Sequence, residues 1–155
     1  MKKVLIALDY APTAQKVAET GFSLARLLGA EILLLHVMAD VTYYSVIEHA
    51  QIMGTMGFTK TELDHLFDGG LKKAMKQFLE RSKQQLGDEN IQTLVKEGDF
   101  AESIIKTGKD FHADFIVMGT HSRNWVDSII LGSVTKKVLS HTSIPLFIVP
   151  IKKNQ

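Results

Sequence analysis

Short apolar segments alternate with longer amphipathic segments along most of this chain. Five of the short segments are dominated by aliphatic residues: Val4–Leu8, Ile32–Val37, Ile91–Val95, Phe115–Met118 and Leu146–Val149. Near-continuous apolar runs of this length are typical of strands that are buried on both faces. The third run has mixed polarity. The pattern predicts five short strands.

The segments between the runs carry apolar residues at the three- and four-residue spacing of amphipathic helices. The predicted helices cover about residues 12–28, 71–86, 99 onwards and 132–140. Gly29 and Gly87 suit the C-terminal caps of the first two helices. Asp99 and Glu102 have the N-cap and N3 spacing of a capping box at the start of the third helix.

Strands that alternate with helices in this way predict one parallel sheet with helices on both faces. The chain has 155 residues, which is enough for one domain and too few for two ordinary ones. We therefore predict an α/β fold, a single-domain three-layer α/β/α sandwich with a five-stranded parallel sheet. Residues 39–68 form an irregular insertion after the second strand. This insertion is either a lid or partner surface, or a loop packed against the second helix.

Composition excludes several classes of protein. The chain has no cysteine and a formal net charge of +1, so neither a disulfide scaffold nor a strongly basic nucleic-acid binder is indicated. No apolar stretch is long enough to cross a bilayer, and the first run ends too early for a signal peptide. We expect a cytoplasmic protein without nucleic-acid or membrane partners. The six histidines lack the His-x3-His spacing of a helical zinc pair, so we expect no metal site.

The stretch from Asp114 to Thr135 carries the candidate chemistry. An apolar strand breaks at Gly119, a polar loop follows, and Gly132 opens a helix. The first amides of a helix have no intrahelical partner, and the helix dipole favours an anion there. Ser133 and Thr135 add hydroxyl groups. The pattern is typical of a phosphate site, although an ordinary Ser/Thr helix start has the same local sequence.

This stretch resembles a known motif. Gly119-x2-Ser122-x9-Gly132-Ser133 is similar to the nucleotide loop of universal stress proteins, Gly-x2-Gly-x9-Gly-Ser/Thr, with Ser122 at the second glycine. The similarity extends over the whole chain, including the closing segment Ile144–Pro150. It implies the ATP-binding branch of that family and the strand order 3-2-1-4-5. It also implies a homodimer formed by antiparallel pairing of the last strands, here Leu146, Phe147, Ile148 and Val149.

The resemblance further implies a set of residues around ATP or AMP. Ala7, Leu8 and Asp9 would contact the base and ribose, and the backbone of Val37 would bind adenine. The remaining positions lie near the ribose and the phosphates: Met118, Gly119, His121, Ser122, Gly132, Ser133, Val134 and Thr135. Any Mg²⁺ would be carried on the phosphates and held mostly by phosphate and water.

Several of these residues also have a plain structural interpretation. Asp9 is a common turn or helix-cap residue, Val37 is a core residue, and Gly119 is an ordinary break after a strand. His121 is either a ligand contact or an exposed loop residue. His36 stands alone in an apolar run, which favours a structural role over a ligand role. For Arg123 we favour a solvated loop cation over a phosphate contact, and for Trp125 we favour an anchor on the protein over stacking on a base.

Ser122 predicts reduced affinity. If the family's glycine adopts a positive φ, serine costs about 1–2 kcal/mol at that position. Since about 1.4 kcal/mol is a factor of ten in affinity, we expect binding to weaken by roughly one to one-and-a-half decades. The serine hydroxyl would recover part of this by donating to phosphate.

The sequence supports three functions. The first is a homodimeric binding or signalling module for ATP or AMP in the stress response, acting on a protein partner. The second is a slow ATPase or autophosphorylating protein, with a loop hydroxyl such as Ser133 as acceptor. The third is a nucleotide-free dimeric interaction protein. We favour the first, because no nucleophile–base pair for catalysis can be named. A Walker A loop and a Gly-x-Gly-x-x-Gly fingerprint are absent from the sequence.

Overall fold

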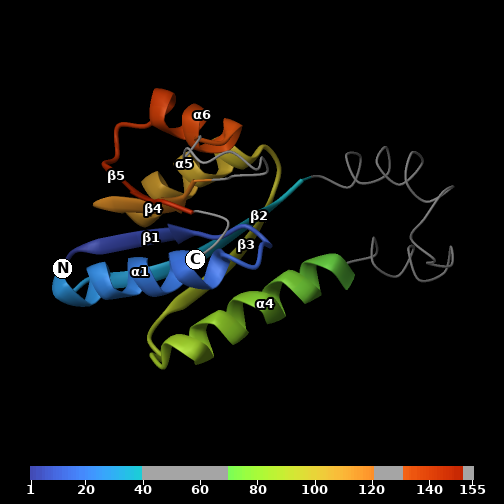
Figure 1. Ribbon diagram of the computed structural model, residues 1–155, viewed down its shortest axis with the longest axis vertical. Helices are drawn as coiled ribbons and strands as arrows, with labels where there is room; N and C mark the ends of the chain where they lie inside the picture. The colour runs from blue at the N-terminus through green and yellow to red at the C-terminus, as the bar shows by residue number, and fades with distance from the viewer. Residues whose placement is uncertain (40–69, 121–130, 152–155) are drawn as a thin grey trace, which may run out of the picture.

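A computed structural model describes residues 1–39, 70–120 and 131–151 of the chain (Figure 1). In these residues strands and helices alternate: β1 (Lys3–Ala7), α1 (Ala14–Leu27), β2 (Glu31–Met38), α4 (Leu71–Leu86), β3 (Gln92–Glu97), α5 (Phe100–Phe111), β4 (Phe115–Gly119), α6 (Ser133–His141) and β5 (Leu146–Val149). The predicted strands and helices are confirmed, with ends that agree within a residue or two. The insertion predicted at 39–68 lies outside the described residues except for Ala39.

The strands form one sheet in the order β3-β2-β1-β4-β5, and every neighbouring pair is parallel. The predicted fold class and strand order are therefore confirmed. β1 is the central strand: Leu5 pairs with Leu33 on one side and with Ile116 on the other. The strand order reverses between β1 and β4, because the chain first builds the sheet toward β3 and then returns to the other side of β1.

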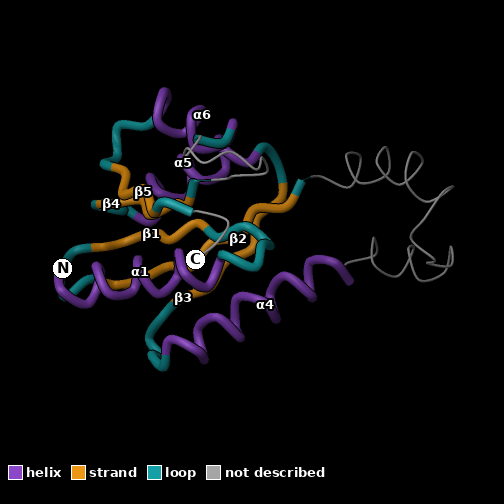
Figure 2. Tube along the Cα trace, in the orientation of Figure 1, coloured by secondary structure: helices purple, strands orange, loops and turns teal. Residues whose placement is uncertain are grey.

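Helices cover both faces of this sheet, α1 and α4 on one face and α5 and α6 on the other (Figures 1 and 2). Successive side chains of β1 point to opposite faces. Ile6 joins the cluster under α1 and α4, and Leu5 joins the cluster under α5 and α6. Both side chains are fully buried, and each contributes roughly 1.5–3 kcal/mol to folding by the usual transfer scale. This burial explains why β1 reads as a continuous apolar run.

The predicted helix caps are present. Gly29 and Gly87 have φ of 60° and 73°, the left-handed region where glycine avoids the strain of a side chain. The amide of Glu102 donates to the Asp99 carboxylate at 2.9 Å, which caps α5. Lys137 of α6 approaches both oxygens of the same carboxylate, at 3.1 and 3.2 Å. Asp99 thus joins the start of α5 to α6.

In the parts of the chain that the structure describes, no helix is both long and apolar enough to span a membrane.

Replacing Asp99 by alanine is expected to lower the free energy of unfolding by about 1 kcal/mol, the typical value of an N-cap. For a domain of this size the melting temperature would fall by roughly 2–4 °C. Asp99→Asn is the matched control, since asparagine caps helices as well as aspartate. A loss in the asparagine variant as large as in the alanine variant contradicts the capping role.

The same carboxylate predicts a pH dependence. The Glu102 amide and the Lys137 ammonium group hold the pKa of Asp99 below its usual value. A lowered folded pKa gives stability that is present above the unfolded pKa, about 3.9, and is lost as pH falls through the folded pKa. Urea unfolding between pH 5 and pH 2 is expected to show a shallower loss of stability in Asp99→Asn than in the native chain. Parallel curves would contradict this.

Candidate functional site

Three of the predicted site segments meet at the carboxyl edge of the sheet. Ala7 pairs with Leu35, so Asp9 and Val37 each lie two residues further along. Ile6 pairs with Val117, so Leu8 and Gly119 also lie side by side, two residues beyond that pair. Ligands of parallel α/β sheets bind at this edge, where the strand order reverses. The fold therefore brings Asp9, Val37 and Gly119 to one place.

The end of β4 is joined directly to the start of α6. The hydroxyl of Thr135 donates to the carbonyl oxygen of Gly119 at 3.2 Å, across 16 residues of sequence. Thr135 is buried, with 2% of its surface exposed. The hydroxyl that the sequence suggested as a phosphate donor thus has an acceptor within the protein. A phosphate contact from Thr135 would come from its amide.

The first turn of α6 begins at a glycine. Gly132 is the N-cap residue, with extended backbone (φ −65°, ψ 163°), and in the described residues no side chain caps this turn. Lys136 donates its amide to the Gly132 carbonyl at 3.0 Å and so begins the helical ladder. Ser133 is exposed, and Val134 packs against the core under α5 and α6. The turn therefore presents main-chain donors and one accessible hydroxyl.

Glycine at position 119 has a packing role that the sequence did not show. A Cβ atom built there would lie 2.8 Å from Cγ2 of Val17 and 3.3 Å from Cγ1 of Ile151. The first distance is shorter than real Cβ contacts, so the side chains of α1 and of the segment after β5 fill this space. The predicted reason for this glycine was close approach of a ligand. The structure gives another reason, tight packing under the end of β4.

Thr120 fixes the point at which the chain leaves β4. Its amide donates to Val149 at 3.0 Å, and its hydroxyl accepts from the amide of Ile151 at 2.8 Å. Thr120 is buried, so this double contact holds the strand end against β5. The predicted residues His121 and Ser122 lie outside the described residues, as do Arg123 and Trp125.

The end of β2 offers backbone groups beside the end of β1. β1 ends at Ala7, whereas β2 continues to Met38. Leu8 donates its amide to Leu35 at 2.8 Å. Backbone groups alternate in direction along a strand, so Val37 turns its amide and carbonyl to the same side as Leu35, toward β1. β1 ends before the level of Val37, so no residue of β1 lies opposite it. The backbone of Val37 thus faces the place where Asp9 follows β1.

His36 holds the last residue of the β1 run in place. Its Nδ1 lies 2.8 Å from the carbonyl oxygen of Leu8. Because a carbonyl only accepts, Nδ1 carries the hydrogen. Burial lowers the pKa of His36, and the Leu8 contact and the charge of Asp9 oppose that shift. The imidazole is therefore neutral at pH 7, which agrees with the structural role predicted for it.

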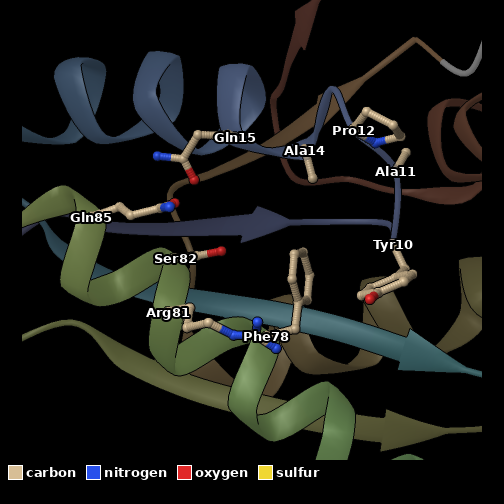
Figure 3. Close-up of a pocket in the computed structure, with 9 residues that line it drawn as sticks. All are labelled: Tyr10, Ala11, Pro12, Ala14, Gln15, Phe78, Arg81, Ser82 and Gln85. Carbon is tan, nitrogen blue, oxygen red and sulfur yellow. The ribbon is translucent and has the colours of Figure 1, made fainter.

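Two residues near the site were missed by the sequence analysis, Tyr10 and Phe78. Their rings meet edge to face across the gap between the loop after β1 and α4, with centroids 5.2 Å apart. They border a cavity of ≈ 230 Å³ between that loop, α1 and α4 (Figure 3). Phe78 lies in the helix predicted over residues 71–86, and nothing in the sequence pattern links it to a residue 68 positions earlier.

Among the described residues, no three histidine, aspartate or glutamate side chains gather closely enough to hold a metal ion.

Comparison with known proteins gives consistent results. The sequence profile of the Universal stress protein family matches residues 1–150. Universal stress protein MJ0577 of Methanocaldococcus jannaschii is 27% identical over 157 residues, which cover 99% of this chain and 97% of that protein. The solved structure of MJ0577 superimposes with a TM-score of 0.71 at 26% identity, covering 99% of this chain and 98% of that one.

Two more distant solved structures share the fold. One is a universal stress protein from Archaeoglobus fulgidus in complex with dAMP, with a TM-score of 0.60 at 16% identity over 96% of this chain and 97% of that one. The other is a universal stress protein in complex with cAMP, with a TM-score of 0.59 at 15% identity over 96% of this chain and 95% of that one.

The packing around Gly119 predicts that Gly119→Ala lowers the free energy of unfolding by about 1–3 kcal/mol, the usual range for overpacking. Val17→Ala removes the atom that a new Cβ would strike. The loss in the double variant is therefore expected to be smaller than the sum of the two single losses by at least about 0.5 kcal/mol. Urea denaturation of the four proteins without ligand measures this coupling. Additive losses would show that the Val17 contact does not restrict position 119.

Proposed function

Because the chain belongs to the universal stress protein family, we propose that it is a cytoplasmic homodimer that binds ATP or AMP and passes this state to a protein partner in the stress response. The observation that carries the proposal is the first turn of α6, which no side chain of the described residues caps and which the Thr135–Gly119 hydrogen bond ties to the end of β4. Asp9 and Val37 end neighbouring strands at the same edge.

In this proposal the phosphates lie at the first turn of α6. The amides of Ser133, Val134 and Thr135 point toward the helix start, and the helix dipole favours an anion there. The exposed hydroxyl of Ser133 adds a fourth donor. Because Gly132 has no side chain, it does not block the approach of the phosphates to these amides. Any Mg²⁺ would arrive on the phosphates, because the described residues gather no cluster of three metal-ligating side chains.

The nucleoside would lie along the ends of β1, β2 and β4. The Asp9 carboxylate suits a ribose hydroxyl or the adenine amine, both of which donate hydrogen bonds. The backbone of Val37 has a donor and an acceptor on the side that faces Asp9, which matches an adenine edge. Ala7 and Leu8 would contact the base, and Met118 and Gly119 would lie near the ribose. His121 and Ser122 belong to the proposed site as ribose and phosphate contacts.

The related complexes support this choice of ligand. The two distant structures with bound ligands hold dAMP and cAMP, and both ligands are adenine nucleotides. Because their identity to this chain is low, the proposal rests mainly on the strand ends and the first turn of α6 in this chain.

We propose in addition that two copies pair through β5. β5 is an edge strand of the sheet, and an exposed edge favours pairing with another chain. Phe147 is 40% exposed, and Leu146 and Ile148 are half-buried against the core under α5 and α6. Antiparallel pairing of Leu146–Val149 with the same strand of a second copy would cover both the backbone edge and Phe147.

Titration calorimetry with ATP, AMP and cAMP tests the ligand. Gly132→Asp places a carboxylate at the N-cap of α6, where it accepts from the first-turn amides and repels phosphate. We expect ATP affinity to fall at least about tenfold, with no loss of thermal stability. Gly70→Asp is the matched control, since Gly70 is the N-cap of α4. No binding by the native chain, or equal affinity in Gly132→Asp, contradicts the proposal.

Light scattering tests the dimer. Phe147→Asp puts a charge on the exposed side of the edge strand, and we expect the particle mass to fall to that of one chain. Leu139→Asp is the control, because Leu139 is also exposed and apolar, at 54%, but lies on α6. A Phe147→Asp protein that keeps the native mass places the interface elsewhere.

A further inference from the structure

Three aromatic side chains from three different elements form a contiguous cluster beside the proposed nucleoside position. Tyr10 lies in the loop after β1, His36 on β2 and Phe78 on α4. Phe78 meets Tyr10 with ring centroids 5.2 Å apart and an interplanar angle of 76°, and meets His36 at 6.0 Å and 81°. Edge-to-face contact is a favoured arrangement of aromatic rings, because the positive edge of one ring meets the negative face of the other.

This aromatic cluster holds the chain on both sides of Asp9. His36 donates to the carbonyl of Leu8, the residue before Asp9. Tyr10, the residue after Asp9, rests against Phe78. The backbone on each side of Asp9 is therefore connected to Phe78: Tyr10 touches it directly, and Leu8 is bonded to His36, which touches it.

Tyr10 is 67% exposed, and among the described residues its ring contact is with Phe78 of α4. The cavity of ≈ 230 Å³ opens beside this contact. Figure 3 shows Phe78 between Tyr10 and the far end of the cavity, where Ser82 and Gln85 lie. Removal of the Phe78 ring would leave Tyr10 facing open space, and the loop would have room to shift toward α4.

We propose that Phe78 is a positioning residue for the nucleoside half of the ligand. It acts through Tyr10 and His36 to hold Asp9 in reach of the ribose and base, and it does not touch the ligand itself. This inference rests on the proposed nucleotide function. The phosphate half is independent of it, because the first turn of α6 lies on the opposite face of the sheet from α4 (Figure 1).

Nucleoside binding and the position of α4 are expected to affect each other. If one position of α4 raises the affinity for a nucleoside, a bound nucleoside raises the population of that position by the same factor. α4 begins directly after residues 40–69 and carries an exposed basic and polar face, including Lys73, Lys76 and Arg81. In this proposal, the contacts of Phe78 with Tyr10 and His36 connect the nucleoside position to α4.

A purely structural role for Phe78 predicts a different outcome. Phe78 packs against the core cluster under α1 and α4, as does Phe22 of α1. If the ring only fills the core, its loss weakens every ligand equally or none. If it positions Asp9, its loss weakens ligands that contain a nucleoside and spares ligands that contain only phosphate.

The experiment compares Phe78→Leu, Phe78→Tyr and the control Phe22→Leu. Two ligands are titrated, ATP and tripolyphosphate, the second up to millimolar concentration. Binding of each is followed by the shift of the amide resonance of Val134. We expect Phe78→Leu to weaken ATP about three- to tenfold and tripolyphosphate less than twofold. Phe78→Tyr keeps the ring and is expected to keep the affinity. Phe22→Leu is expected to change neither ligand.

A second readout needs no ligand. In Phe78→Leu the amide resonances of Asp9, Tyr10 and Ala11 are expected to shift, while those of Gly119 and Thr135 stay in place. Unshifted loop amides, or an equal loss of both ligands in Phe78→Leu, overturn the inference and leave the nucleotide proposal standing. A native chain that responds to neither ligand overturns the proposed function, and the inference falls with it.

Discussion

The hydrogen bond from Thr135 to the carbonyl of Gly119 is the contact on which the arrangement of the site depends. It joins the end of a central strand to the first turn of a helix that lies 16 residues away in sequence. The side chains of Val17 and Ile151 occupy the space beside Gly119, and Thr120 is bonded to the chain on either side of the end of β5. The end of β4 is therefore in contact with α6, with α1 and with the end of β5. The bond to Thr135 places the first turn of α6 beside the end of β4.

The site proposed here has two halves with different supports. The phosphate half depends on α6 and β4, and its donors are main-chain amides at a helix start that no side chain of the described residues caps. The nucleoside half depends on the ends of β1 and β2, and its position is set by His36, Tyr10 and Phe78. α6 and α4 lie on opposite faces of the sheet, so we expect a change at Phe78 to alter the nucleoside contacts and to leave the first turn of α6 in place. In the proposed function, the phosphate half would recognise the charge of the ligand, and the nucleoside half would lie next to the aromatic cluster that includes Phe78 of α4.

Much of the fold could be predicted from the sequence, because each strand is a run that the core requires to be apolar. β1 illustrates this, with Val4, Leu5 and Ile6 fully buried between the two helical layers. Asp99 was predicted as a cap from its spacing to Glu102, and the bond is present. The strand order could not be predicted in this way, because hydrophobic periodicity does not specify which strands are neighbours. It was predicted from the resemblance to universal stress proteins.

The site was predicted less completely, because it depends on contacts between residues far apart in sequence. Gly119 was expected to make room for a ligand. In the structure, side chains of the protein occupy the space that a Cβ atom at this position would need. Thr135 was expected to offer a hydroxyl, which in fact bonds to Gly119. The contact of Phe78 with Tyr10 was absent from the analysis altogether, because helical spacing says only that Phe78 faces inward. Local patterns identify which residues are buried, while their partners are set by how the layers pack.

A crystal structure of the chain grown with ATP tests the central claim most directly. The account predicts phosphate oxygens within hydrogen-bonding distance of the amides of Ser133 to Thr135, and the adenine edge against the backbone of Val37. ATP bound at another surface would contradict the account. So would a structure in which the protein's own side chains fill the space beside Val37 and Gly119 and accept from those amides.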